Sequence, residues 1–459
     1  MTVAQLVWTL IKIFIMVFFL LNLAGILTWV DRRQSSMIQD RIGPNRAVVK
    51  IFGKEFRLLG LLHTAADGIK FFTKEDFMPP RADALLFMLA PIITMAAVFA
   101  LLAAIPFGDT ICGHQFWLHF PNVFTGPAVQ RWGSCPSDVK NGYYPVELSI
   151  APLSVGILYI FAISGQGIIG AAIAGWASDN KFSLMGALRA ASQMVSYEVT
   201  LGMSLIGAMM IYGTIRLDDM VRWQSEHAWG VFVQPLGFFL FFAASVAENK
   251  RIPFDLPEAE SEHVSGYFTE YAGMKFGMFY FAEYAEVVTG SMLLVTIFLG
   301  GWAVPFLHRD GLTIAFGSAE IVRSLVPHVW MTVIGVLAFF AKVVVVCLVQ
   351  AFVRWSLPRF RYDQLMRLGW KILLPVSLAN VLITGVVWLA LDQAGPAVSD
   401  ALRVAADVTQ AIVVVVVTYL VVRGVLGLLT PVKHQQTLLG TSADEAVKRG
   451  GTKATPMQA

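Results

Sequence analysis

Long apolar stretches recur along the chain and are separated by short polar segments. Each stretch approaches or exceeds the roughly 20 residues that a helix needs to cross the hydrocarbon core of a bilayer. The pattern therefore predicts an all-α integral membrane protein with nine transmembrane helices. The predicted helices cover 6–30, 83–106, 148–175, 190–213, 231–247, 278–304, 328–353, 370–391 and 405–429.

The composition agrees with a membrane protein. The 459 residues are 56% hydrophobic and only 14% charged, which leaves too little polar surface to cover a soluble globule of this size. The first apolar stretch has no basic region before it and no small-residue cleavage site after it, so we expect it to remain as the first helix. Residues 1–430 are predicted to form one membrane domain, and the polar tail 431–459 is predicted to be disordered.

Lysine and arginine are distributed unevenly between alternate loops. The loops on one side hold 25 of them and the loops on the other side hold 7, while Lys12 and Lys342 lie inside predicted helices. Because cytoplasmic loops carry the excess of positive charge, the N-terminus is predicted outside and the C-terminus in the cytoplasm, across the inner membrane. The basic residues are spread over several loops and form no single face, which argues against nucleic-acid binding.

The three cysteines are too few for an iron–sulfur cluster or a tetrahedral zinc site, so no metal is expected in this chain. Cys112 and Cys135 fall in the outer loop 107–146, where an oxidising compartment permits a disulfide. We predict that these two cysteines are bridged, and two free thiols are the alternative. Cys347 lies inside an apolar helix, where a thiol behaves as a small hydrophobic group.

The first charged cytoplasmic loop begins with DRRQSSMIQDRIGPN at 31–45, in which Gly43, Pro44 and Asn45 form a turn with Arg41 and Arg46 beside it. It continues into 63–76, where apolar residues recur at near-helical spacing opposite charged ones. That segment predicts a short amphipathic helix at the membrane interface.

The second charged loop, 248–277, is acidic, and Pro253 and Pro257 interrupt any helix in it. Crowded carboxylates repel one another, so their protonation is coupled. A solvated surface loop is the alternative interpretation. The third loop, 354–371, is basic, and an anchor to lipid phosphates is the alternative there. The acids of the second loop are Glu248, Asp255, Glu258, Glu260, Glu262 and Glu270.

Ionisable residues also occur inside the apolar segments. Glu198 and Glu283 each cost on the order of 3 kcal/mol at the bilayer centre unless they are neutral, paired or hydrated. Glu286 follows Glu283 on the same helix face, and Lys342 lies in another apolar segment, so a buried acid–base chain is geometrically possible. Glu147 lies at the outer end of the third predicted helix. It is either a functional acid or a residue that only marks the membrane interface.

Six motifs, in this order along the chain, resemble a known family. That family is the membrane subunit that seals the quinone chamber of proton-pumping NADH:quinone oxidoreductase (respiratory complex I), known in bacteria as the H-type subunit. The motifs are QDRIGPNR (39–46), FTKED (72–76), GWASDNKFSLMGALRAASQMVSYEV (175–199), AENKRIPFDLPEAESE (247–262), EYAGMKF (270–276) and LPRFRYDQLMRLGWK (357–371).

The resemblance implies that the subunit contacts a peripheral arm, in which FMN and iron–sulfur clusters of partner subunits pass electrons to a quinone. It places the quinone near the first loop and the acidic loop, and implies that buried ionisable groups lead charge toward antiporter-like membrane subunits. The quinone-binding residues so expected are Arg33, Arg41, Arg46, Asp67, Lys70 and Arg251. The charge-coupling residues are the six acids of the loop 248–277 together with Glu198, Glu283 and Lys342.

Two departures from the family pattern stand out. Asp31 occupies a position where the family usually has Glu, and the outer loop 107–146 is long. Three other functions compete with this interpretation: the similar membrane subunit of an energy-converting hydrogenase, a stand-alone ion transporter and a structural anchor. No internal repeat with paired broken segments, of the kind that marks many transporters, is seen in the sequence.

Overall fold

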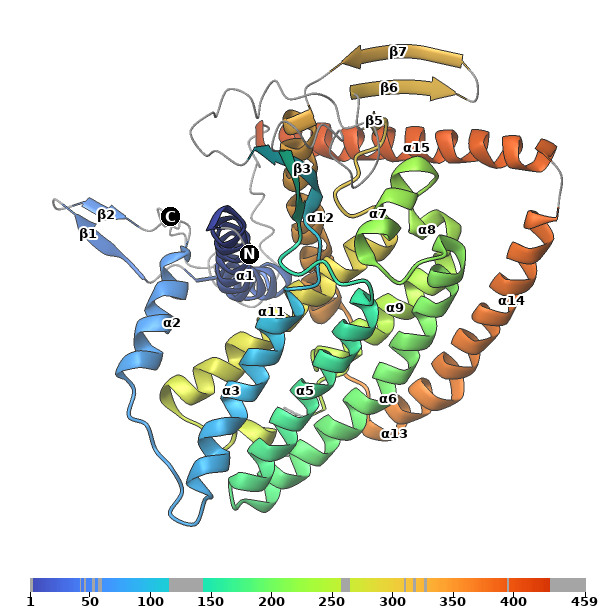
Figure 1. Cartoon of the computed structure of the whole chain (residues 1–459). Coiled ribbons are helices and arrows are strands. Elements are labelled where there is room, and N and C mark those ends of the chain that lie inside the picture. The colour runs from blue at the N-terminus through green and yellow to red at the C-terminus, as the bar shows by residue number, and fades with distance from the viewer. Residues whose placement is uncertain are drawn as a thin grey trace, which may run out of the picture. The chain divides into compact units, whose positions relative to one another are not determined.

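The computed structural model describes residues 3–41, 43–44, 47–51, 54–56, 60–114, 143–256, 265–308, 311–316, 319–325, 328–393 and 396–429. These residues are mainly helical, which confirms the all-α prediction (Figure 1). Seven helices of the described chain are long and apolar enough to cross a membrane. They are α1 (Val3–Ile38), α3 (Ala84–Leu101), α5 (Gly156–Ala177), α6 (Lys181–Tyr212), α11 (Gly273–Phe298), α12 (His328–Ser356) and the run through α13 (Tyr362–Leu368) to α14 (Leu374–Asp392).

The other two predicted crossings coincide with shorter apolar helices. One is α9 (Pro235–Glu248), and the other is the stretch Val404–Leu420 within α15 (Pro396–Leu429). All nine predicted segments thus coincide with helical chain, while the total of nine crossings and the orientation stay predictions. Residues 1–410 form one compact unit, and residues 411–459 form a second, of which the part up to 429 is helical.

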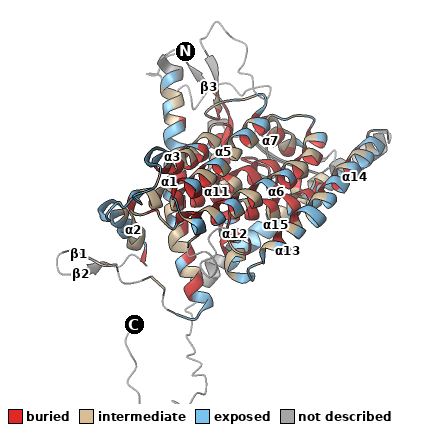
Figure 2. Ribbon diagram, turned by 90° about the horizontal axis from the view of Figure 1, so that it is seen from below, coloured by how far each residue is buried: buried red, intermediate tan, exposed pale blue. Residues whose placement is uncertain are grey.

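Helix α11 is the centre of the first unit. In its most apolar window 83% of the residues are buried, compared with 17% for the run through α13 and α14. It packs against α1, α3 and α12, and Figure 2 shows buried positions concentrated around it. A helix that is apolar all round is expected at such a central position. Polar side chains in the middle of α11, such as Glu283, are therefore held inside the protein.

Helices α3, α5 and α6 approach one another closely because small residues line their contacts. A Cβ on Gly170 of α5 would lie 2.2 Å from Thr94 Oγ1 of α3. A Cβ on Gly175 would lie 2.2 Å from the Cβ of Ala187 in α6. These two glycines let the three helices that flank the candidate site pack with little space between them.

The loops add short secondary structure. Strands β1 (Val49–Ile51) and β2 (Lys54–Phe56) form one hairpin, and β5 (Leu307–His308), β6 (Gly311–Phe316) and β7 (Ala319–Leu325) form an antiparallel sheet. Strands β3 (Gly108–His114) and β4 (Tyr143–Leu148) frame the outer loop, with Cys112 opposite Pro145. Cys135 lies outside the described residues, so its predicted disulfide with Cys112 is untested.

The predicted interfacial helix is present as α2 (Leu62–Thr73). Its apolar side chains Ile69 and Phe72 are 65% and 75% exposed and face away from the protein, while Asp67 forms an ion pair with Arg32 at 2.6 Å. An apolar side that no described residue covers is typical of a helix lying at a bilayer surface.

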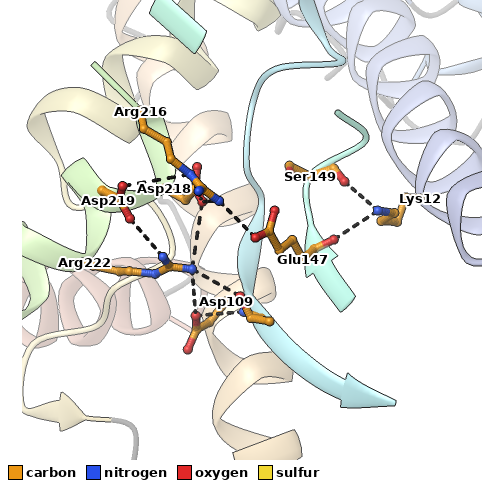
Figure 3. Close-up of polar contacts among 9 residues, drawn as sticks. Lys12, Asp109, Glu147, Ser149, Arg216, Asp218, Asp219 and Arg222 are labelled. Atoms are coloured by element: carbon orange, nitrogen blue, oxygen red, sulfur yellow. Dashed lines mark hydrogen bonds and ion pairs between the residues drawn. The ribbon is translucent and has the colours of Figure 1, made fainter. Parts of the chain in front are cut away.

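An ion network fastens the β3–β4 hairpin to α7 (Leu217–Glu226) (Figure 3). Arg216 lies 2.9 Å from Glu147 and 2.7 Å from Asp218. Arg222 lies 2.9 Å from Asp219 and donates to Thr110 Oγ1 at 3.2 Å. Glu147, which was ambiguous in the sequence, is thus a member of this network.

The same hairpin is fastened to α1 by a buried lysine. Lys12 Nζ donates to the carbonyl oxygens of Glu147 and Ser149 at 3.1 and 2.7 Å (Figure 3). The ammonium is thereby satisfied by backbone carbonyls, as a buried cation must be.

Arg222→Met should lower the free energy of unfolding by roughly 2 kcal/mol, because it removes a cation that lies 4.0 Å from the buried Asp109 and 3.9 Å from the buried Asp218. Thermal unfolding of the purified complex in detergent measures this loss. Arg32→Met, which breaks the partly exposed pair with Asp67, is the control and should change little. Equal loss in the two variants would contradict the prediction.

Candidate functional site

Four helical or loop segments bring charge together around Asp31, a buried residue near the end of α1. One of its carboxylate oxygens, Oδ2, accepts hydrogen bonds from Tyr284 at 2.8 Å and Arg251 at 3.2 Å, and a third from Arg354. The guanidinium carbon of Arg251 also lies 3.6 Å from the centre of the Tyr284 ring. We call these four residues the Asp31 cluster.

The Asp31 cluster holds two guanidinium groups and one carboxylate, so it carries an excess of positive charge. A cavity of about 20 Å³ adjoins it, which is room for about one water molecule. Apolar residues such as Leu27 and Val287 line part of this cavity, and Asn249 and Gln350 add amides to its wall. A positive, poorly hydrated site of this kind stabilises negative charge that forms beside it.

Asp255 lies in the loop after α9 and pairs with Arg359 at 2.7 Å. Burial raises the pKa of this carboxyl to about 6, and the Arg359 guanidinium opposes the rise. Glu283 and Arg354 also act on Asp255, and Glu283 acts on Arg251 as well. Glu283 on α11 therefore links the loop electrostatically to the Asp31 cluster.

Three further contacts extend this set of charges along α11. Glu283 accepts a hydrogen bond at 3.0 Å from the hydroxyl of Tyr267, which lies in the short 3-10 helix Gly266–Phe268. One turn further along α11, Glu286 Oε2 lies 3.4 Å from Lys250 Nζ. Lys250 in turn lies 5.9 Å from the centre of the Tyr267 ring.

A second cavity, which we call the acid cavity, lies between α3, α5, α6, α9 and α11. It measures about 60 Å³, enough for several water molecules, and Glu248, Glu286 and Ser164 line it. Ser164 donates to Glu198 at 3.2 Å, and Glu198, Glu286 and Lys250 all act on Glu248. Asn249 lines this cavity as well as the cavity beside the Asp31 cluster.

The described residues thus form a line of interacting ionisable groups, with a hydratable cavity at one end. It runs from the Asp31 cluster through Glu283, Tyr267, Lys250, Glu286 and Glu248 to Glu198. Such groups in a low-dielectric interior can pass protons through water and can sense each other's charge. We call this set the charge line.

Of the residues that the sequence suggested for quinone binding, the structure brings only Arg251, within its described part, into this arrangement. Asp67 pairs with Arg32, and Lys70 is exposed on α2. Arg41 is exposed after the end of α1, and Arg33 is partly buried on α1.

Two of the suggested coupling residues are also placed elsewhere. Glu270 accepts a hydrogen bond from Asn180 at 2.7 Å and lines a separate surface cleft with Arg81 and Lys181. Lys342 donates to the carbonyl oxygens of Leu299, Gly301 and Ala303 at 2.8, 3.0 and 2.7 Å, and lies 4.3 Å from the centre of the Trp229 ring.

Lys342 is thus the cap of the α11 C-terminus, and its three hydrogen bonds go to backbone carbonyls rather than to an acid of the charge line. Gly300 and Gly301 have positive φ angles of 73° and 48°, which turn the chain so that these carbonyls converge on the ammonium. A role of Lys342 in charge transfer remains a prediction that this geometry does not favour.

Several suggested residues lie outside the described part of the chain, so the structure says nothing of them. They are Arg46, Glu258, Glu260 and Glu262. Within the described part, no group of three or more His, Cys, Asp or Glu side chains is arranged to hold a metal ion.

The sequence did not single out Tyr267, Tyr284, Arg354, Lys250 and Ser164 as functional, although each contacts a member of the charge line. For Lys250 and Arg354, the position in a charged loop was the one sequence feature that pointed to a function. Tyr284 and Ser164 carried none, because isolated hydroxyl groups in apolar segments are common, and Tyr267 was one uncharged residue of the acidic loop.

The chain is similar to known proteins over most of its length. A family model described as NADH dehydrogenase matches residues 11–385. An H-type subunit of NADH-quinone oxidoreductase from Cytophaga hutchinsonii is 41% identical over 358 residues, which cover 78% of this chain and 90% of that protein. The corresponding subunit of Flavobacterium psychrophilum is 40% identical over 362 residues, which cover 79% of this chain and 91% of that protein.

A relative from another bacterial genus gives the same picture. An H-type subunit of NADH-quinone oxidoreductase from Geobacter sulfurreducens is 38% identical over 378 residues, which cover 82% of this chain and 93% of that protein. The region that the family model matches includes every residue of the Asp31 cluster and of the charge line, which lie between 31 and 354.

Arg359→Gln should make the stability of the protein depend more strongly on pH. Because the folded-state pKa of Asp255 lies above its usual value of 3.8, this carboxyl favours folding when protonated, and that contribution is lost as the pH rises through about 6. Loss of the guanidinium raises this pKa further. The deficit in melting temperature relative to the parent should therefore be small at pH 5 and grow between pH 6 and 8.

Asp255→Asn combined with Arg359→Gln is the control, because it leaves no carboxyl to titrate. Its difference from Asp255→Asn alone should not vary with pH. A deficit of Arg359→Gln that stays constant from pH 5 to 8 would show that the pair does not set the titration of Asp255.

Proposed function

The chain belongs to the NADH dehydrogenase family whose bacterial members include the H-type subunit of NADH-quinone oxidoreductase, and from this membership we propose that its charge line couples quinone reduction to proton translocation. It is a multi-pass inner-membrane subunit of the proton-translocating complex, complex I, and its partners are other subunits of that complex. The hydrogenase-type alternative is not favoured, because the matched relatives are named as quinone oxidoreductase subunits.

The substrate of the complex is a quinone, and this chain contributes protein groups around it. We propose that FMN and iron–sulfur clusters in peripheral-arm subunits deliver the electrons, which end on the quinone. In this proposal Arg33 on α1, Asp67 and Lys70 on α2, and Arg41 and Arg46 in the loop between these helices lie near the quinone entry. The acidic loop, with Glu258, Glu260 and Glu262, borders the chamber.

One observation carries the coupling proposal: ionisable groups connect a positive, poorly hydrated cluster to a hydratable cavity deep among the helices. The Asp31 cluster is buried and has two guanidinium groups on one carboxylate. Glu283 and Glu286 continue from it along the most buried helix of the bundle. Acids in such a place are costly unless they are neutral, paired or hydrated, and ordinary packing needs no carboxylate there, so a function is the first explanation for them.

The physical steps follow from charge balance. A quinone that is reduced gains negative charge and takes up protons from nearby acids. Loss of a proton from Glu283 leaves a carboxylate, and its field acts on Arg251 of the Asp31 cluster and on Glu286. Because this field is little screened inside the protein, the next carboxyl along the line changes its protonation in turn.

At the far end, Glu248 and Glu198 border or adjoin the acid cavity, whose water can exchange protons with them. We propose that charge leaves this chain there, toward the antiporter-like membrane subunits. Electrons stay with the quinone, and protons and their charge move along the line.

Glu248→Gln should reduce coupled NADH:quinone activity and proton pumping together by roughly tenfold or more, because it removes the proton-carrying group between Glu286 and Glu198. Both rates are measured in inverted membrane vesicles that contain the intact complex. NADH oxidation with an artificial acceptor ahead of the quinone reports the amount of assembled complex and should stay normal.

Glu226→Gln, in the outer helix α7, is a suitable control because this acid lies away from the charge line. It should leave both rates unchanged. Full coupled turnover in Glu248→Gln, at a normal content of complex, would overturn the proposed function.

A further inference from the structure

Lys250 is the one ammonium among the described members of the charge line, and its side chain is 1% exposed. It follows α9 closely and has a φ angle of +54°. A residue with a side chain adopts this left-handed conformation at a cost, and it persists only where the surroundings require it. In this conformation the side chain of Lys250 reaches Glu286, and Lys250 Nζ lies 3.4 Å from Glu286 Oε2.

A buried glutamine of α6 holds the segment that carries Lys250. The amide nitrogen of Gln193 donates to the carbonyl of Ala247 at 2.8 Å and to the carbonyl of Phe254 at 2.7 Å. These two carbonyls bracket residues 248–253, and Gln193 is fully buried. The backbone of Lys250 also donates to Ala247, at 3.3 Å. The position of the ammonium is therefore fixed by α6 and α9 together.

The charges around Lys250 are unbalanced. Glu286 is the ion-pair partner of Lys250, and Lys250 also acts on Glu248. The ring of Tyr267 lies near the ammonium of Lys250, and the hydroxyl of Tyr267 donates to Glu283. One ammonium can balance only one carboxylate, so the remaining acids of this part of the line are stable mainly as neutral groups or as a set that shares protons. The position of Lys250 then determines which of these acids stays ionised.

We propose that Lys250 is the fixed counter-charge of the line: its ammonium holds Glu286 as a carboxylate, so that one internal ion pair separates the quinone side from the acid cavity. The inference rests on the proposed function and adds to it a residue that acts through Glu286. Lys250 is thus a positioning residue for charge. Without it, the four glutamates of the line would all be neutral, and a charge that appears at the Asp31 cluster would have no ion to displace.

Three variants test this role in inverted membrane vesicles with the intact complex. Lys250→Gln should lower coupled NADH:quinone activity about fivefold or more, on the scale by which residues of a coupling network act. Lys250→Arg keeps the positive charge and should retain most of the activity. Lys181→Gln, which changes an exposed lysine at the start of α6, is the matched control and should match the parent.

The double variant Lys250→Gln with Glu286→Gln separates an electrostatic role from a packing role. If Lys250 acts by keeping Glu286 ionised, the two losses are not additive, and the double variant is no slower than either single variant. Additive losses, or equal losses for Lys250→Gln and Lys250→Arg, would overturn the inference and leave only a structural lysine.

The outcome is also distinguishable from a failure of the proposed function itself. Normal coupled activity in Lys250→Gln together with a large loss in Glu248→Gln would reject only the role of Lys250 and would leave the proposed function standing. Normal activity in both variants, at a normal content of complex, would reject the charge line.

Discussion

An ion inside a low-dielectric bundle needs a compensating partner, and this constraint shapes the molecule more than any other. Moving an unpaired charge from water into such an interior costs several kcal/mol or more, so each buried charge has to be matched by an opposite charge, a hydrogen bond or water. The structure meets this requirement in two ways. Lys12 and Lys342 are surrounded by backbone carbonyls, whereas Asp31 and Glu286 have cationic partners.

The two ways have different consequences for function. Carbonyl oxygens cannot take up protons, so a lysine held by them is a permanent support for the fold. A carboxylate that faces an arginine or a lysine can change its protonation when a neighbouring charge changes. The carbonyl-bound lysines fasten the β3–β4 hairpin and the end of α11, whereas the ion pairs of Asp31 and of Glu286 lie around the middle of α11.

Much of the fold could be predicted from the sequence because membrane helices are encoded locally. Every predicted crossing coincides with a helix, and the amphipathic segment after the first crossing forms α2. For α9 the helix is shorter than the apolar pattern, since Pro235 begins it and Glu248 ends it. The candidate site was only partly predictable: Glu198 and Glu283 stood out as acids in apolar segments, and Glu248 was one of the acids of the charged loop 248–277. Their connection depends on tyrosines and on a lysine whose partners lie far away in the sequence.

The lysine cap on α11 has a mechanical consequence. Glu283 and Glu286 belong to the same continuous helix that ends in the turn held by Lys342 on α12. A shift of this helix along its axis would have to stretch three hydrogen bonds at that turn at once. Exchange of α11 between two axial positions is therefore opposed from its far end, and Glu283 and Glu286 keep their positions along the helix axis.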